Sequence, residues 1–97
     1  MTTVPRHEDF APFVGHAFRF DGWHGSLRLA EIETGRDPKV PGLLRVPFTL
    51  IFHGPRGDIL AQGQYDATTG DGARFRFHIM PIHTPAPDRQ EYQAVFN

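Results

Sequence analysis

The 97-residue chain has no cysteine, one tryptophan, one lysine and no long apolar run. The lack of cysteine excludes disulfide bonds, thiolate catalysis and zinc sites with Cys ligands. No stretch approaches the roughly 20 apolar residues of a membrane-spanning helix, and the start MTTVPRHEDF has neither the basic end nor the apolar run of a signal peptide. We therefore expect cytoplasmic synthesis without a signal peptide and no membrane partner. A phage-like or exported assembly is a second location to consider.

Excess charge of either sign is also missing. Ten basic and eleven acidic residues are scattered along the chain and give a net charge of -1. Proteins that bind nucleic acid or anionic membranes usually carry a basic patch. Nucleic acid is therefore not a favoured partner.

The chain has many turn-forming residues: ten glycines and nine prolines divide it into short segments. This spacing favours short strands over helices and leaves no room for crossover helices between strands. We predict a single all-β domain over residues 1–97, with antiparallel meanders closing into a small barrel or sandwich. About six strands are expected, within His16–Phe20, Ser26–Glu33, Pro47–His53, Ile59–Ala67, Ala73–Ile82 and Glu91–Phe96.

Three local features refine this prediction. The segment HEDFAPFVG predicts a short helical turn started by Glu8 or Asp9, whose phenylalanines plug one end of the barrel or sandwich. In Ser26–Glu33 the apolar parity changes before Ile32, which indicates a β-bulge near Ala30. In Pro47–His53 an isoleucine lies on the polar parity, so we expect that second face to be partly covered.

The stretch FHGPRGDILAQGQY, from Phe52 to Tyr65, combines an Arg-Gly-Asp tripeptide with turn residues. We interpret it as two strands joined by a reversal at Pro55–Asp58, because Gly and Asp favour tight turns. Adhesion through Arg56 and Asp58 is a minor hypothesis. The longest loop is expected at Thr34–Arg45, and long loops are often contact sites.

Catalytic and cofactor patterns are missing. Ser26 is the one serine, and it lies outside the strand-to-helix elbow that exposes a nucleophile. The six histidines show no metal-ligand spacing, and GPRGD lacks the helix and lysine of a phosphate loop. We expect no cofactor, no metal and no enzymatic activity; a hydrolase with a dispersed site ranks last among our hypotheses.

One strand suggests a binding surface. In RFRFH, Arg74, Arg76 and His78 alternate with phenylalanines, so they share the face opposite the apolar side chains. Arginines and aromatics on a sheet can bind single-stranded nucleic acid, but here they face opposite ways. A small barrel that binds an anionic ligand or a single strand through these three residues is the alternative function.

Three ordered pieces carry a family resemblance: DFAPFVGHAFRF near the start, PFTLIFHGP followed by LAQGQY in the middle, and YQAVFN at the end. With these pieces the chain resembles a family of small bacterial domains of unknown function. The resemblance implies no activity, cofactor or catalytic residue. Members look to be encoded beside proteins similar to phage tail collar or tail fibre proteins, which implies a structural role. The leading hypothesis is therefore a non-catalytic subunit, adaptor or assembly factor that binds other chains or itself.

Overall fold

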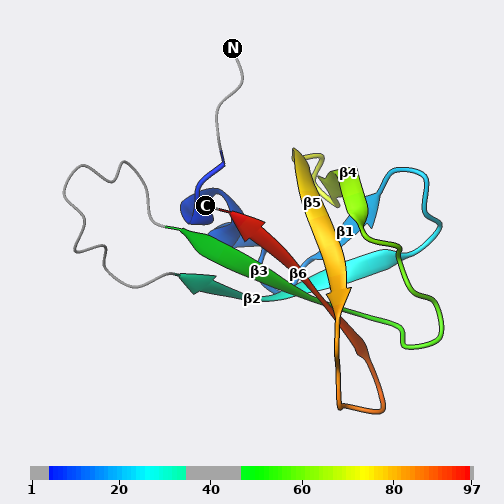
Figure 1. Cartoon of the computed structure of the whole chain (residues 1–97). Helices are drawn as coiled ribbons and strands as arrows, with labels where there is room; N and C mark the ends of the chain where they lie inside the picture. Colours follow the sequence, from blue (N-terminus) through cyan, green and yellow to red (C-terminus); the bar gives the residue numbers. More distant parts are fainter. Residues whose placement is uncertain (1–4, 35–46, 97) are drawn as a thin grey trace.

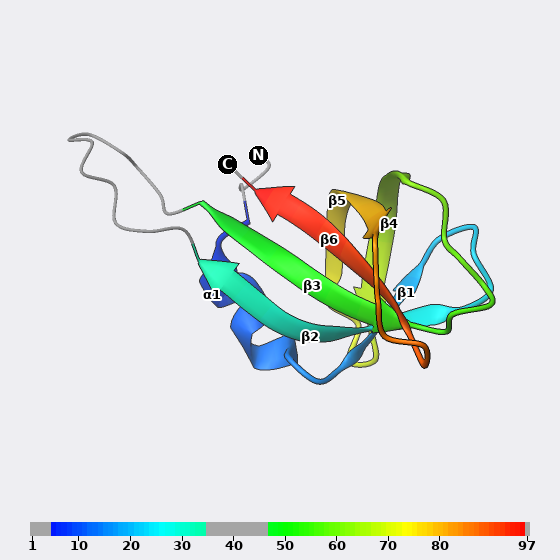
Figure 2. The same cartoon turned by 60° about the horizontal axis from the view of Figure 1, so that its bottom comes forward.

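The computed structural model describes residues 5–34 and 47–96, and it shows a closed antiparallel β-barrel (Figures 1 and 2). Two short helices, α1 (His7–Phe10) and η1 (Ala11–Phe13), precede the strands. The six strands are β1 (Ala17–Phe20), β2 (Ser26–Thr34), β3 (Phe48–Gly54), β4 (Gly63–Thr69), β5 (Arg74–Ile82) and β6 (Gln90–Phe96). The predicted all-β class is confirmed, and the barrel is the form that the chain adopts. Most of the predicted long loop, at residues 35–45, lies outside the described residues.

The strand order around the barrel is β1-β2-β3-β6-β5-β4. The predicted antiparallel meanders are present as two sets, β1-β2-β3 and β4-β5-β6, which close into the barrel where β3 pairs with β6 and β1 pairs with β4. β3 and β4 are not neighbours, however, so FHGPRGDILAQGQY does not form a hairpin. The connection between them runs from residue 55 to residue 62 and crosses one end of the barrel, where Leu60 is buried.

The predicted alternation of side chains fills the barrel. Phe48, Leu50 and Phe52 of β3 are all buried, as the period of a half-buried strand requires. Ile51 faces the other way and is still only 8% exposed, so the partly covered second face is confirmed. Aromatic rings fill much of the interior, where each removes a large area from water. The fully buried large side chains are Phe10, Phe18, Phe20, Leu27, Leu29, Leu50, Phe52, Ile79 and Tyr92.

The bulge predicted near Ala30 is confirmed by the pairing of β2 with β3. Leu29 pairs with Phe52, and the next pair joins Glu31 to Ile51, so Ala30 has no partner. The extra residue moves Ile32 back to the inner face, where it packs against the core.

The N-terminal helical segment plugs the barrel, as expected. β5 pairs with β6 only through Met80–Ile82, so the two strands separate above this point in Figure 1. The Phe10 ring fills the space between them, with centroid distances of 4.5 Å to Phe75 and 5.5 Å to Phe96. One detail of the prediction was wrong. α1 begins after Arg6, and the Asp9 carboxylate accepts the Arg6 N–H at 2.8 Å, so this acid supports the cap from inside the first turn.

Candidate functional site

The five residues singled out in the sequence fall into two groups. Arg56 and Asp58 lie in the connection between β3 and β4, whereas Arg74, Arg76 and His78 lie on the outer face of β5. The first group takes part in contacts that join separate loops. The second group forms local pairs on the sheet surface.

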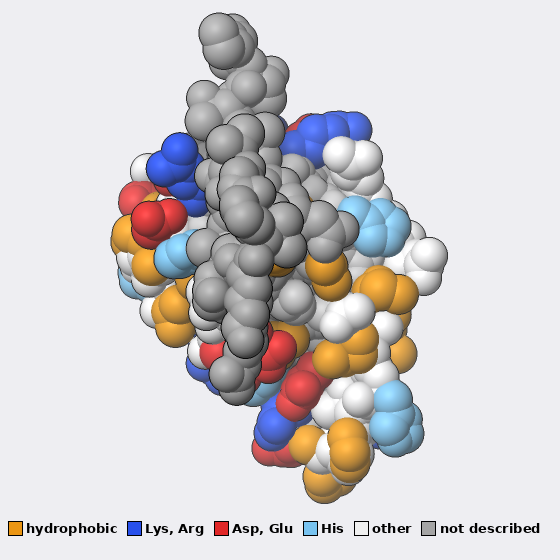
Figure 3. All heavy atoms as spheres, turned by 60° about the vertical axis from the view of Figure 1, so that its left-hand side comes forward, with side chains coloured by type: hydrophobic (Ala, Val, Ile, Leu, Met, Phe, Trp, Pro, Cys, Tyr) orange, Lys and Arg blue, Asp and Glu red, His pale blue; other side chains and the backbone are white. Residues whose placement is uncertain are grey.

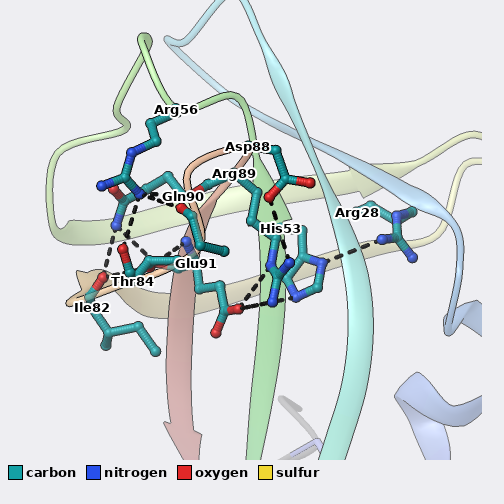
Figure 4. Close-up of polar contacts among 10 residues, drawn as sticks. Arg28, His53, Arg56, Ile82, Thr84, Asp88, Arg89, Gln90 and Glu91 are labelled. Atoms are coloured by element: carbon teal, nitrogen blue, oxygen red, sulfur yellow. Dashed lines mark hydrogen bonds and ion pairs between the residues drawn. The ribbon is translucent and has the colours of Figure 1, made fainter.

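Arg56 connects two loops at one end of the barrel (Figure 4). Its Nη1 lies 3.0 Å from the carbonyl oxygen of Thr84, 2.9 Å from that of Ala86 and 2.9 Å from that of Arg89. All three carbonyls belong to the β5–β6 loop or its junction with β6, about 30 residues further along the chain. A cationic donor strengthens such hydrogen bonds. Arg56 therefore fixes the β5–β6 loop against the β3–β4 connection.

Asp58 makes a second link. Its carboxylate Oδ2 contacts the Nε2 of His24, in the turn between β1 and β2. The Arg and Asp of the tripeptide thus join three connections at the same end of the barrel. An adhesion motif presents both side chains to a receptor, and these internal contacts argue against that role.

Further hydrogen bonds stabilise the same end. The Thr84 hydroxyl donates to the Ile82 carbonyl and accepts the N–H of Glu91, each at 2.9 Å. The Tyr92 hydroxyl accepts the Leu60 N–H at 2.9 Å. We call residues 55–62 and 83–89 the two-loop tip. Its loops are fixed from both sides, and it presents apolar side chains to solvent: Pro55, Ile59, Pro85 and Pro87.

Replacing Tyr92 by phenylalanine is expected to lower the free energy of unfolding by about 1–2 kcal/mol, because the buried Leu60 N–H loses its acceptor. Chemical denaturation measures this change. The control is Tyr65→Phe, since the Tyr65 hydroxyl donates to Ala61 at an exposed position and its loss should have less effect. Equal losses in the two variants would contradict the assigned role of Tyr92.

A charged cluster lies beside the tip on the outer face of β2, β3 and β6 (Figure 4). We name it the His53 cluster; it consists of Arg28, His53, Arg89 and Glu91. Arg28 donates from Nη2 to His53 Nδ1 at 3.3 Å, so that nitrogen carries no proton. Arg89 binds the Glu91 carboxylate through Nε at 2.8 Å and Nη2 at 2.7 Å. His53 Nε2 lies 3.7 Å from the same carboxylate oxygen.

The surroundings of His53 favour its neutral form. Burial is the largest cause that lowers its pKa from the ordinary value of 6.5, and the positive charge of Arg89 is the next. Arg28 acts in the same direction, while Glu91 and Glu31 act against it. The neutral ring also keeps the hydrogen bond that Arg28 donates. The cluster is therefore assembled at neutral pH and opposed by acid.

We predict a pH dependence of stability from this shift. The pKa of His53 is lower in the folded chain than in the unfolded chain, so the unfolded chain takes up the proton first as the pH falls. The contribution of His53 to the free energy of unfolding is therefore complete above pH 6.5. It is lost as the pH falls through the lowered pKa of the folded chain. The measurement is the unfolding free energy of the wild type and His53→Gln from pH 8 to pH 5. The difference between them should shrink with acid, while His78→Gln, at an exposed position, serves as control. A difference independent of pH would contradict the prediction.

The residues on β5 form modest surface pairs. Arg76 lies 3.1 Å from Asp66, its cross-strand neighbour on β4, and Arg74 lies 3.4 Å from Asp21. His78 is exposed and faces Gln64 on β4. Exposed pairs of this kind contribute little to stability, but each places a carboxylate beside an arginine. The positive charge that made this strand a candidate for anion binding is thus largely balanced.

Residues 5–34 and 47–96 contain no group of three or more His, Asp or Glu placed to hold a metal ion. Ser26 and His24 line the same hollow, and no hydrogen bond in this part of the chain joins the serine to the ring. None of the described helices has both the length and the apolar character to cross a bilayer.

The fold and the tip define a small antiparallel barrel with a helical plug and one end fixed by side-chain contacts between loops. The chain belongs to the family described as Domain of unknown function (DUF6916), whose model matches residues 5–96. This confirms the resemblance to a small domain of unknown function. No curated protein and no solved structure matches the chain.

Proposed function

We propose that this domain is a non-catalytic structural module that acts as a subunit, adaptor or assembly factor of a phage-tail-like or fibre assembly. The observation that carries the proposal is the two-loop tip, in which Arg56 holds two loops together at three carbonyl oxygens. Loops fixed before binding lose little entropy when a partner covers them. The family resemblance implies neighbouring genes for proteins similar to phage tail collar or tail fibre proteins, and this supports a partner of that class.

The surface of the tip also suits a protein contact. Ile59 is 53% exposed there, beside exposed prolines of both loops. Seen from another side in Figure 3, the lower end of the molecule projects and carries hydrophobic and histidine side chains together. Contacts between proteins use such apolar centres with polar surroundings. We therefore assign the partner-binding surface to the tip.

The test mixes the purified protein with a phage-tail-collar-like protein, the class of partner that the family resemblance implies, and follows complex formation by size-exclusion chromatography. Co-elution is expected, and Ile59→Asp should abolish it by placing a charge in the apolar centre. Val14→Asp is the matched control, because Val14 is also exposed, at 44%, but lies outside the tip. Co-elution that survives Ile59→Asp would remove the tip from the proposal.

The alternative function is a small barrel that binds an anionic ligand or single-stranded nucleic acid through Arg74, Arg76 and His78. The pairing of both arginines with aspartates counts against it. If that function holds, replacing both arginines by alanine should abolish binding to single strands.

A further inference from the structure

A row of polar side chains crosses the outer face of the barrel on three neighbouring strands. Arg19 of β1 pairs with Ser26 of β2 on one side and with Thr68 of β4 on the other. Directly paired residues point to the same face of a sheet, with Cβ atoms about 5 Å apart. The Arg19 side chain therefore leaves the sheet between those of Ser26 and Thr68, and these three paired residues include no carboxylate.

Arg19 is a cation of this face that has no partner among the described residues. Within the described residues its guanidinium has no hydrogen bond and no ion pair, whereas Arg74 and Arg76 each contact an aspartate. The other arginines named above also have partners: Arg28 binds a histidine, Arg56 binds backbone carbonyls and Arg89 binds a carboxylate. The planar fork of an arginine matches the oxygens of a carboxylate or phosphate. Arg19 thus has unused donors in a position free of acidic competitors in its own row.

The surface is hollowed beside this arginine. A shallow recess of about 320 Å³ is lined by Ala17, Arg19, His24, Gly25 and Ser26. Its shape depends on the β1–β2 turn, where a Cβ on Gly25 would lie 3.0 Å from the Trp23 ring. The contact with Asp58 holds His24 at the rim. The recess is therefore formed by ordered elements, with the arginine and the serine hydroxyl on its wall.

We propose that this recess binds one oxyanion group, a phosphate or a carboxylate, of a small molecule. The Arg19 guanidinium binds two of its oxygens and the Ser26 hydroxyl donates to the same group. The proposal is independent of the assembly function, because neither residue belongs to the two-loop tip. It also places anion binding at a position different from Arg74, Arg76 and His78.

The test is an NMR titration of the ¹⁵N-labelled full chain at pH 7, with inorganic phosphate in one arm and acetate in the other. Sodium chloride keeps the ionic strength constant, so general screening does not change during the titration. Saturable shifts are expected at the amides of residues 17–19 and 24–26. Arg19→Gln should weaken binding by about tenfold or more, since it removes the charge-assisted contacts.

The matched control is Arg76→Gln, on the same face but paired with Asp66, which should leave the affinity unchanged. Saturation with phosphate, with acetate or with both supports the proposal and identifies the group that is bound. Linear shifts in both arms, or saturable shifts that persist in Arg19→Gln, would overturn it. The spectrum of each variant without ligand confirms that the fold is retained.

Discussion

Replacing Phe10 by alanine is expected to lower the free energy of unfolding by about 3–5 kcal/mol, the usual cost of deleting a fully buried phenylalanine. Phe10 is 0% exposed and packs between β5 and β6, where the strands do not pair. Its ring contacts those of Phe48, Phe75, Phe77 and Phe96. Domains of this size are stable by about 5–15 kcal/mol, so this single change removes a large part of the total.

Urea denaturation followed by circular dichroism measures this effect. Val14→Ala is the control, because Val14 lies just after η1 and is 44% exposed, so its truncation should change stability by less than about 0.5 kcal/mol. A loss below about 1 kcal/mol for Phe10→Ala would mean that the helical segment is an appendage and not a plug.

The second large effect is expected at Arg56. Arg56→Ala removes the donor for three carbonyls at once, and we expect a loss of about 2 kcal/mol, since hydrogen bonds to charged groups are among the stronger ones. Amide hydrogen exchange should also become faster at residues 83–89, because the β5–β6 loop loses its link to the β3–β4 connection.

Two variants serve as controls for Arg56→Ala. Arg56→Lys keeps the charge and a nitrogen donor, but on a side chain of different length and shape, and should retain part of the stability. Arg74→Ala breaks an exposed pair at 3.4 Å and should cost less than about 0.5 kcal/mol. Unchanged exchange at residues 83–89 in Arg56→Ala would contradict the role of this arginine as a link between loops.

The sequence predicted the local structure well where side-chain parity determines it. Three patterns each predicted one local structure correctly. The alternation in β3 predicted which side chains are buried, the change of parity near Ala30 predicted a bulge, and the phenylalanines of the N-terminal turn predicted the plug. The order of the strands around the barrel could not be predicted from side-chain parity. The position of β6 between β3 and β5 depends on contacts between residues about 40 positions apart, and no short pattern records them.

The candidate site was predictable only in part. Arg56 and Asp58 were singled out because they belong to an Arg-Gly-Asp tripeptide. The acceptors of Arg56, however, are backbone carbonyls of a distant loop. Every residue has such a carbonyl, so the sequence does not show which ones Arg56 contacts. The His53 cluster was missed for a similar reason, since its members come from three strands and the β5–β6 loop. Arg19 shares the outward parity of Arg74 and Arg76, and only the position of the aspartates distinguishes it from them.

The most direct test of the assembly function is the mass of the protein in solution. Multi-angle light scattering is applied to the purified chain of 11.0 kDa, alone and mixed with a phage-tail-collar-like protein, the class of partner that the family resemblance implies. The proposal predicts a mass above that of the single chain in at least one of the two samples, and ordered particles in electron micrographs of that sample. A mass of 11.0 kDa for this chain in both samples would contradict it.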